Sequence, residues 1–340
     1  MKRARLIGLL LLVTCTASPA LAGNSSRLGT AGAQELRIPV SARGMALGDG
    51  IMATVSGVEA IYYNPAGMSD LDGVEAYFSH MEYLAGIDKN YVAAVTETPI
   101  GTVGLMVDVL SIGDIEETTV DEPEGTGKTF SPNFAVVGMS YSRFLTDAVS
   151  VGGTAKLISE RILEESANGL AFDIGIQYRP GWQGLRFGFL LKNFGPEMQF
   201  DGDDFESFQS SSDNPEADPR VMRTQSAPFE LPSVFQMGVG YTFLEDGSNR
   251  MQGFGNFVSN NFGSDQWNLG AEYSFGRTFA LRAGYLASED EGNLFSNTFS
   301  FGAGLGIPLS SSTHLQVDYG MRKVDSYFDD TQIFSAKFTF

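Results

Sequence analysis

Residues 299–307 read Phe-Ser-Phe-Gly-Ala-Gly-Leu-Gly-Ile, so every second residue in this stretch is apolar and the residues between them are small. Successive side chains of a β-strand point to opposite faces, and strict alternation of this kind indicates a strand. The stretch therefore predicts a β-strand with one apolar face and one face of serine and glycine.

The same alternation recurs from residue 74 to the last residue, Phe340. It predicts fourteen strands of about ten residues each, at 74–81, 90–98, 102–112, 132–143, 149–159, 170–179, 185–192, 233–244, 250–258, 266–276, 278–287, 297–308, 313–322 and 331–340. Tight connections alternate with long ones at 113–131, 160–169 and 193–232. These features predict an all-β protein, a transmembrane antiparallel β-barrel of the bacterial outer membrane, with its short turns and both chain ends in the periplasm.

A soluble β-sandwich is the alternative, in which the apolar faces would meet across a dry core. The polar faces favour the barrel, because they carry isolated charges of both signs, as expected for a water-filled or plugged lumen. These candidate lumen-facing residues are Asp108, Lys156, Asp173, Glu272, Arg282, Asp318 and Lys337. The last strand carries Phe338 and the terminal Phe340, which resembles the assembly signal of outer-membrane proteins. The expected partners are therefore outer-membrane lipid and the barrel-assembly machinery.

Residues 1–22 have the features of a cleaved signal peptide. Basic residues precede an apolar core, and Ala20-Leu21-Ala22 supplies the small residues of a cleavage site. A lipoprotein signal at Cys15 is the alternative, although Val13 and Thr14 make a poor lipobox. Cys15 is the only cysteine, so the cleaved chain would contain no disulfide.

Composition and motifs point away from nucleic-acid binding and from catalysis. The net charge of −19 excludes nucleic acid as a partner, because phosphate binding requires a basic face. The run Gly127-Lys128-Thr129 ends like a phosphate-binding loop, but Glu122 replaces its first glycine. The only histidines, His80 and His314, fall near opposite rims, about 25 Å apart for a band of that height. We therefore expect no enzyme, no cofactor and no metal site.

Residues 23–73 lack strand alternation and are rich in small residues. A barrel of fourteen strands is wider than side chains alone can fill, so we expect this segment to plug the lumen of a barrel formed by 74–340. Within it, Pro65 biases Asn64 toward an extended backbone, and Gly67 permits a close backbone approach. An ordinary surface turn is the alternative for Asn64-Pro65.

Two runs in this segment, 37–50 and 57–68, resemble the N-terminal signature of PorV/PorQ-like proteins, which belong to the FadL-like superfamily of outer-membrane barrels. Tyr63 stands where that family often has tryptophan before Asn-Pro-Ala-Gly. The resemblance implies a plug motif made of Arg43, Gly48, Asn64, Pro65, Ala66 and Gly67.

It also implies one of two functions. The prediction is a non-enzymatic component of protein secretion or surface assembly that binds and shuttles secreted proteins. The alternative is a FadL-like channel, in which a hydrophobic ligand moves from an extracellular pocket toward an opening in the barrel wall.

The segment 193–232 is the longest predicted loop, and nine of its residues are acidic. We expect it to lack regular structure and to dock a basic or cation-bearing partner through acidic residues with aromatic anchors. The candidate docking residues are Asp201, Asp203, Asp204, Phe205 and Phe208. A solvated loop is the alternative, and calcium binding stays open because Asp201 to Asp204 lack the full calcium-loop spacing.

Overall fold

The computed structural model describes residues 27–340 except 183, 210–219, 277, 290–293 and 325–326. The predicted signal peptide at 1–22 lies outside the described residues.

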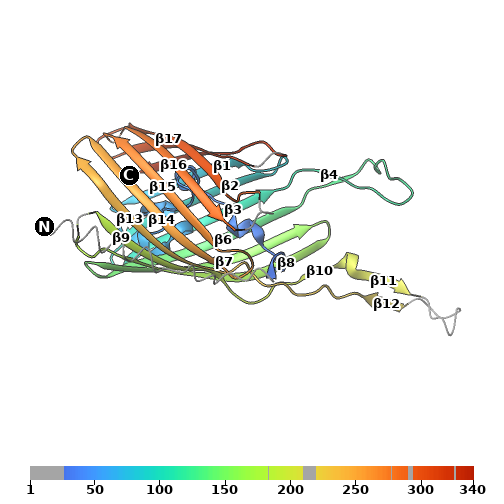
Figure 1. Cartoon of the computed structure of the whole chain (residues 1–340). Helices are drawn as coiled ribbons and strands as arrows, with labels where there is room; N and C mark the ends of the chain where they lie inside the picture. The colour runs from blue at the N-terminus through green and yellow to red at the C-terminus, as the bar shows by residue number, and fades with distance from the viewer. Residues whose placement is uncertain (1–26, 183, 210–219, 277, 290–293, 325–326) are drawn as a thin grey trace.

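In this described part, fourteen antiparallel strands form one closed barrel (Figure 1). They are β1 (Val74–Glu82), β2 (Asp88–Thr98), β3 (Gly101–Ser111), β6 (Asn133–Thr146), β7 (Val149–Ile162), β8 (Glu165–Tyr178), β9 (Leu185–Phe194), β13 (Val234–Asp246), β14 (Asn249–Asn260), β15 (Gln266–Phe275), β16 (Phe279–Ser288), β17 (Thr298–Pro308), β18 (His314–Arg322) and β19 (Thr331–Thr339). Each strand pairs with the next one in the wall, and β1 pairs with β19 to close the ring. The predicted fold and number of strands are confirmed.

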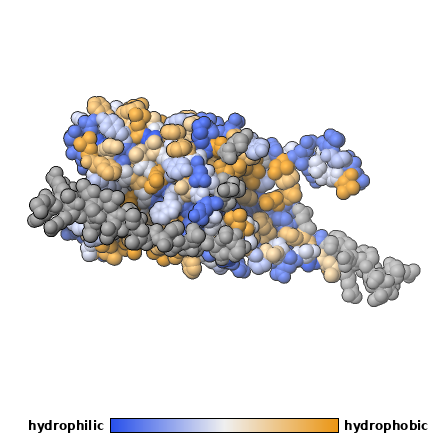
Figure 2. Space-filling view, viewed as in Figure 1, coloured by the Kyte–Doolittle hydropathy of each residue, from blue (hydrophilic) through white to orange (hydrophobic). Residues whose placement is uncertain are grey.

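The apolar faces of the strands point outward. Leu269 on β15 is 51% exposed, and its neighbours in sequence, Asn268 and Gly270, point toward the interior. Because the wall is one sheet, no second sheet covers these apolar residues, which excludes the sandwich alternative. Figure 2 shows apolar residues spread over the barrel wall. Such an outer surface suits lipid. No helix in the described residues is long and apolar enough to span a bilayer.

The expected asymmetry of the connections holds, with one correction. The predicted long connection at 160–169 is wrong, because β7 and β8 continue through it and leave only Leu163 and Glu164 between them. Arg161 and Glu164 are exposed there. Polar residues on the outward side remove the apolar alternation, whereas the backbone pairing continues.

Two hairpins project beyond the rim that carries the long loops, here called the loop rim (Figure 1). One joins β4 (Ile115–Glu116) to β5 (Thr129–Phe130). The second contains β10 (Phe200–Gly202), η5 (Asp203–Phe205), β11 (Glu206–Gln209) and β12 (Arg220–Arg223). The prediction that 193–232 lacks regular structure is therefore wrong: β10 pairs with β8, and β11 pairs with β12. Strands of only three or four residues are too short to show an apolar alternation in the sequence.

Residues 27–73, here called the N-terminal segment, run inside the barrel from the loop rim to the opposite rim. Arg27 pairs with Glu230 at the loop rim, and Val74 pairs with Phe340 at the other. The segment contains η2 (Gln34–Arg37), α2 (Ala42–Ala46), η3 (Gly57–Glu59), α3 (Ala60–Tyr63) and η4 (Pro65–Ser69). Most of its residues from 33 to 68 are buried. The predicted periplasmic N-terminus lies outside the described residues, whereas the first described residues lie at the loop rim.

Because the outward face is apolar, we expect a charged residue on it to lower the free energy of unfolding more in the middle of the membrane than at its edge. Leu269→Arg, near the middle of β15, should lower the free energy of unfolding in lipid vesicles by about 2–4 kcal/mol. Leu309→Arg, in the turn after β17, should lower it by about 0–1 kcal/mol, because the interface hydrates the charge. Urea titration of the refolded variants measures both. Equal costs at the two positions would contradict a lipid-covered wall.

Candidate functional site

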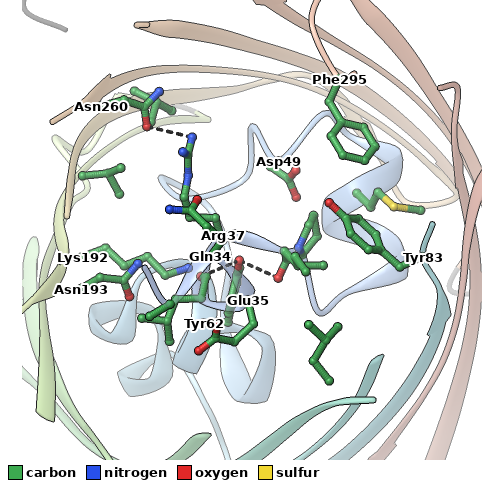
Figure 3. A pocket seen from close by; sticks show the side chains of 18 of the residues that line it. Gln34, Glu35, Arg37, Asp49, Tyr62, Tyr83, Lys192, Asn193, Asn260 and Phe295 are labelled. Atoms are coloured by element: carbon green, nitrogen blue, oxygen red, sulfur yellow. Dashed lines mark hydrogen bonds between the residues drawn. The ribbon is translucent and has the colours of Figure 1, made fainter. Parts of the chain in front are cut away.

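A cavity of about 800 Å³ lies between the N-terminal segment and the loop rim. Figure 3 shows side chains from both the segment and the wall pointing into it. Glu35, Arg37 and Tyr62 come from the segment, and Lys192 and Asn260 come from β9 and β14. The cavity therefore combines charged, polar and aromatic groups in one place.

The Asn64-Pro65-Ala66-Gly67 turn packs against the inner faces of β6, β7 and β8. The Asn64 side chain donates hydrogen bonds to the carbonyl oxygens of Met52 (3.1 Å) and Ile176 (3.2 Å), and accepts one from the Ala66 N–H. Gly67 leaves no room for a side chain, because a Cβ there would lie 2.1 Å from the Val55 carbonyl oxygen. These contacts place the turn in the barrel interior, away from the surface.

Arg43 and Gly48 join the segment to the opposite side of the wall. The Arg43 guanidinium makes two contacts with the Glu272 carboxylate, at 2.9 and 3.0 Å. Glu272 also pairs with Arg282 at 2.6 Å, and Arg282 pairs with Asp318 at 2.7 Å. Gly48 has a φ of +63°, and a Cβ there would lie 2.9 Å from the Leu269 carbonyl oxygen. Glycine is the residue that combines this conformation with so close an approach.

The other sequence-predicted lumen residues also form interior ion pairs. Asp108 pairs with Lys89 at 3.0 Å, and Lys156 pairs with Asp173 at 2.5 Å. Lys337 lies 3.7 Å from Glu59 of the N-terminal segment. Burial alone would raise the pKa of Glu59, but Lys337 and Arg43 lower it below its ordinary value. Glu59 therefore stays ionised and holds the segment to β19.

The predicted docking residues do not converge on a site. Asp201 is exposed and pairs with Arg223, Asp203 is exposed, and Phe205 is half-buried. The side chains of Asp204 and Phe208 lie outside the described residues. No group of three or more His, Cys, Asp and Glu residues in the described chain could hold a metal ion.

Sequence reasoning missed the cavity groups Glu35, Arg37 and Lys192. Lys192 is 5% exposed, and its Nζ atom lies 3.1 Å from the centroid of the Tyr62 ring. A signal for Lys192 existed, because it follows Arg186, Gly188 and Leu190 on the inward face of its strand. No local pattern marks Glu35 or Arg37, which lie in a segment without periodicity.

The wall is irregular where β8 meets β9, next to the cavity. Phe172 pairs with Phe194 and Ile174 pairs with Leu191, so β9 has one extra residue at this point. Asn193 has a φ of +57°, and both it and Lys192 point inward. The Asn193 N–H donates to Asp173 at 2.8 Å, and its side chain accepts from Lys156 at 2.9 Å. This β-bulge is a feature of the kind that re-aims side chains beside functional sites.

Comparisons with solved structures find barrels of the same architecture. The CymD monoaromatic hydrocarbon channel has a TM-score of 0.55 and 13% identity, over 88% of this chain and 97% of that one. The toluene transporter TbuX of Ralstonia pickettii has a TM-score of 0.55 and 11% identity, over 94% of this chain and 99% of that one. This chain shares their fold. A Pseudomonas aeruginosa FadL homologue is similar as well, with a TM-score of 0.51 and 11% identity, over 89% and 98% of the two chains. No family profile and no curated protein sequence matches the chain.

This likeness shows the fold, whereas the FadL-like superfamily, the outer-membrane location and the PorV/PorQ assignment stay predictions. The structures found are channels and transporters by their names. The two histidines lie at opposite ends of the wall: His80 near the end of β1, bonded to Asn90 at 2.9 Å, and His314 at the start of β18.

The cavity also contains a carboxyl pair, Glu35 and Glu160. Burial and the neighbouring Glu160 raise the pKa of Glu35 to about 8. While the N-terminal segment is packed against the wall, Glu35 stays protonated up to about pH 8. When the segment opens locally, the pKa of Glu35 returns to 4.5 and the carboxyl group ionises at lower pH. Raising the pH from about 4.5 to 8 therefore lowers the free energy of local opening. The Leu36 and Ile38 amides, which donate within η2, should therefore lose hydrogen-exchange protection over that range, after correction for intrinsic rates.

Glu35→Gln should abolish this pH dependence, and Glu164→Gln, at an exposed hairpin position, should leave it unchanged. Protection that falls equally in the Glu35→Gln variant would assign the effect to another group.

Proposed function

We propose that this protein is a passive channel that takes up small hydrophobic molecules across the outer membrane. The observation that carries the proposal is the cavity of about 800 Å³ beside the bulge in the wall. Ligand pockets have volumes of about 300–1,000 Å³ and combine apolar walls with a few polar groups. The solved structures with this fold include channels and transporters named for toluene and other monoaromatic hydrocarbons, which supports the same class of solute.

In this proposal the solute leaves the cavity sideways, into the membrane. The N-terminal segment fills the lumen below the cavity, and ionic contacts such as Arg43 with Glu272 and Lys337 with Glu59 hold it to the wall. Passage straight through the lumen would break these buried pairs, which is costly. We therefore place the exit at the bulge, where Phe172 and Phe194 are exposed on the outer surface and Asn193 lines the cavity.

The secretion and surface-assembly function stays a prediction with less support. It depends on the PorV/PorQ resemblance and on the acidic hairpin near Asp201. Deletion of 197–218 should abolish capture of secreted proteins without unfolding the barrel if that function is correct. The structural likeness to hydrocarbon channels favours solute uptake.

Removal of the bulge tests the lateral exit. Deletion of Asn193 leaves one residue on each strand between the pairs Phe172–Phe194 and Ile174–Leu191, and it should reduce uptake severalfold because the extra residue no longer interrupts the wall. Asn193→Gly keeps the extra residue and its positive φ, so it should retain uptake. The measurement is the rate at which intact Gram-negative cells that produce each variant take up the neutral dye N-phenyl-1-naphthylamine. Wild-type cells no faster than empty-vector cells would contradict the channel, and equal rates for the deletion and wild type would contradict this exit.

A reversible crosslink tests whether the N-terminal segment must move. An ideal Cβ built at Gly240 lies 3.5 Å from the Cβ of Thr54, within the usual range for a disulfide of about 3.5–4.5 Å. Thr54→Cys with Gly240→Cys should therefore join the segment to β13 under oxidising conditions. A lateral exit predicts equal dye uptake before and after reduction with dithiothreitol. Uptake that is low when oxidised and recovers on reduction would show that the solute passes through the lumen instead.

A further inference from the structure

Lys192 has a buried amino group that faces the cavity without a counterion. In the described part of the chain its Nζ atom has no ion pair and no hydrogen bond, and it lies over the face of the Tyr62 ring. Cation–π contact stabilises an ammonium group only by about 0.5–2 kcal/mol. Desolvation of an unpaired ammonium costs several kcal/mol more than that. An anionic group placed beside Lys192 would therefore stabilise the charged form of its amino group.

The carboxyl groups around the cavity are already engaged. Asp49 pairs with Arg322 at 2.5 Å and accepts a hydrogen bond from the Tyr63 hydroxyl at 2.9 Å. Asp173, behind the bulge, pairs with Lys156. Glu35 and Glu160, the other two carboxyl groups of the lining, lie beside each other at the floor. None of these groups makes an ion pair with Lys192 among the described contacts.

The cavity is polar on one side and aromatic on the other. Figure 3 shows Lys192, Asn193 and Arg37 on one side, and Tyr83 and Phe295 on the opposite side. The Tyr83 and Phe295 rings stack with their centroids 5.7 Å apart. Further apolar residues of the lining are Leu84, Leu110, Phe134 and Leu294. A ligand that spans the cavity therefore meets the Lys192 amino group at one end and the Tyr83 and Phe295 rings at the other. Arg322 lies beside Phe295 and is paired with Asp49.

We propose that the cavity selects an aromatic anion, a planar apolar body with one carboxylate or sulfonate group, over a neutral hydrocarbon of the same size. The anionic group lies beside the Lys192 ammonium, and the aromatic body packs against Tyr83 and Phe295. This inference deepens the proposed channel function, on which it depends, and it separates this chain from structures named for neutral solutes such as toluene. Arg37, which also bonds to Asn260 at 3.2 Å, adds a second positive charge on the same side.

Two dyes with nearly the same body test the proposal. 1-Anilinonaphthalene-8-sulfonate is an anion, and N-phenyl-1-naphthylamine is its neutral counterpart. The full-length barrel in zwitterionic nanodiscs should bind the sulfonate more tightly, with the fluorescence of protein-free nanodiscs subtracted. Lys192→Met keeps the length of the side chain and removes its charge, so the affinity for the sulfonate should fall by about tenfold to a hundredfold, as for a lost charge-assisted contact. The affinity for the neutral dye should stay the same or rise.

Two control variants separate charge from folding. Lys192→Arg keeps the charge and should keep the preference for the sulfonate. Lys323→Met removes a solvent-exposed lysine near the end of β18 and should change neither affinity. A variant is a folded barrel if it migrates faster on a detergent gel before boiling than after boiling. A Lys192→Met variant that is folded and keeps the preference for the sulfonate overturns the proposal.

The aromatic side of the cavity, formed by Tyr83 and Phe295, is tested separately. Tyr83→Leu keeps an apolar side chain but removes the ring, so both dyes should bind more weakly by a similar factor. Unchanged affinities in this variant overturn the aromatic part of the proposal. If the wild type binds both dyes equally well, the anion preference is wrong while the channel stands. If it binds neither dye, the channel function itself is contradicted.

Discussion

Closure of the backbone hydrogen bonds is the constraint on which the rest of this structure depends. In lipid an unpaired N–H or C=O group has no water to bond with, so a membrane-spanning sheet must have no edge. The pairing of β1 with β19, from Glu75 with Thr339 to Glu82 with Gln332, joins the two ends of the sheet. The apolar face of every strand can then lie outside, and the polar face must form the interior.

A polar interior creates its own requirement, because charges enclosed by the wall need partners. Six of the seven charged residues predicted from the strand pattern are buried, and all seven form ion pairs. Two of these pairs connect the wall to the N-terminal segment, through Arg43 with Glu272 and through Glu59 with Lys337. Buried pairs of this kind fix one arrangement, since separation of the partners would leave a charge uncompensated. The segment thus supplies counterions to charged residues of the wall.

The cavity is the place where this compensation is incomplete. Above the segment, Lys192 makes no ion pair with any described residue and lies over the Tyr62 ring, and next to it the bulge at Asn193 interrupts the pairing of β8 with β9. Other interior charges, such as Asp108, Lys156 and Arg282, have ion-pair partners. An unpaired cation and an irregular wall at the same point are what a site for an external anionic group requires, and they connect the proposed ligand to the proposed exit.

The sequence by itself determined the barrel. A period of two over fourteen segments is a local property that each strand expresses independently, so even the choice of the face turned toward lipid could be derived from residues such as Phe299 and Phe301. The same pattern marked the charged interior positions. It failed at 160–169, where exposed polar residues hide a paired hairpin, and it gave no signal for β10 to β12. Only the tertiary structure decided which charges meet, that the N-terminal segment descends from the loop rim, and that Lys192 and Arg37 share one cavity. These facts depend on contacts between residues far apart in the chain, such as Arg43 and Glu272, and no local periodicity encodes such contacts.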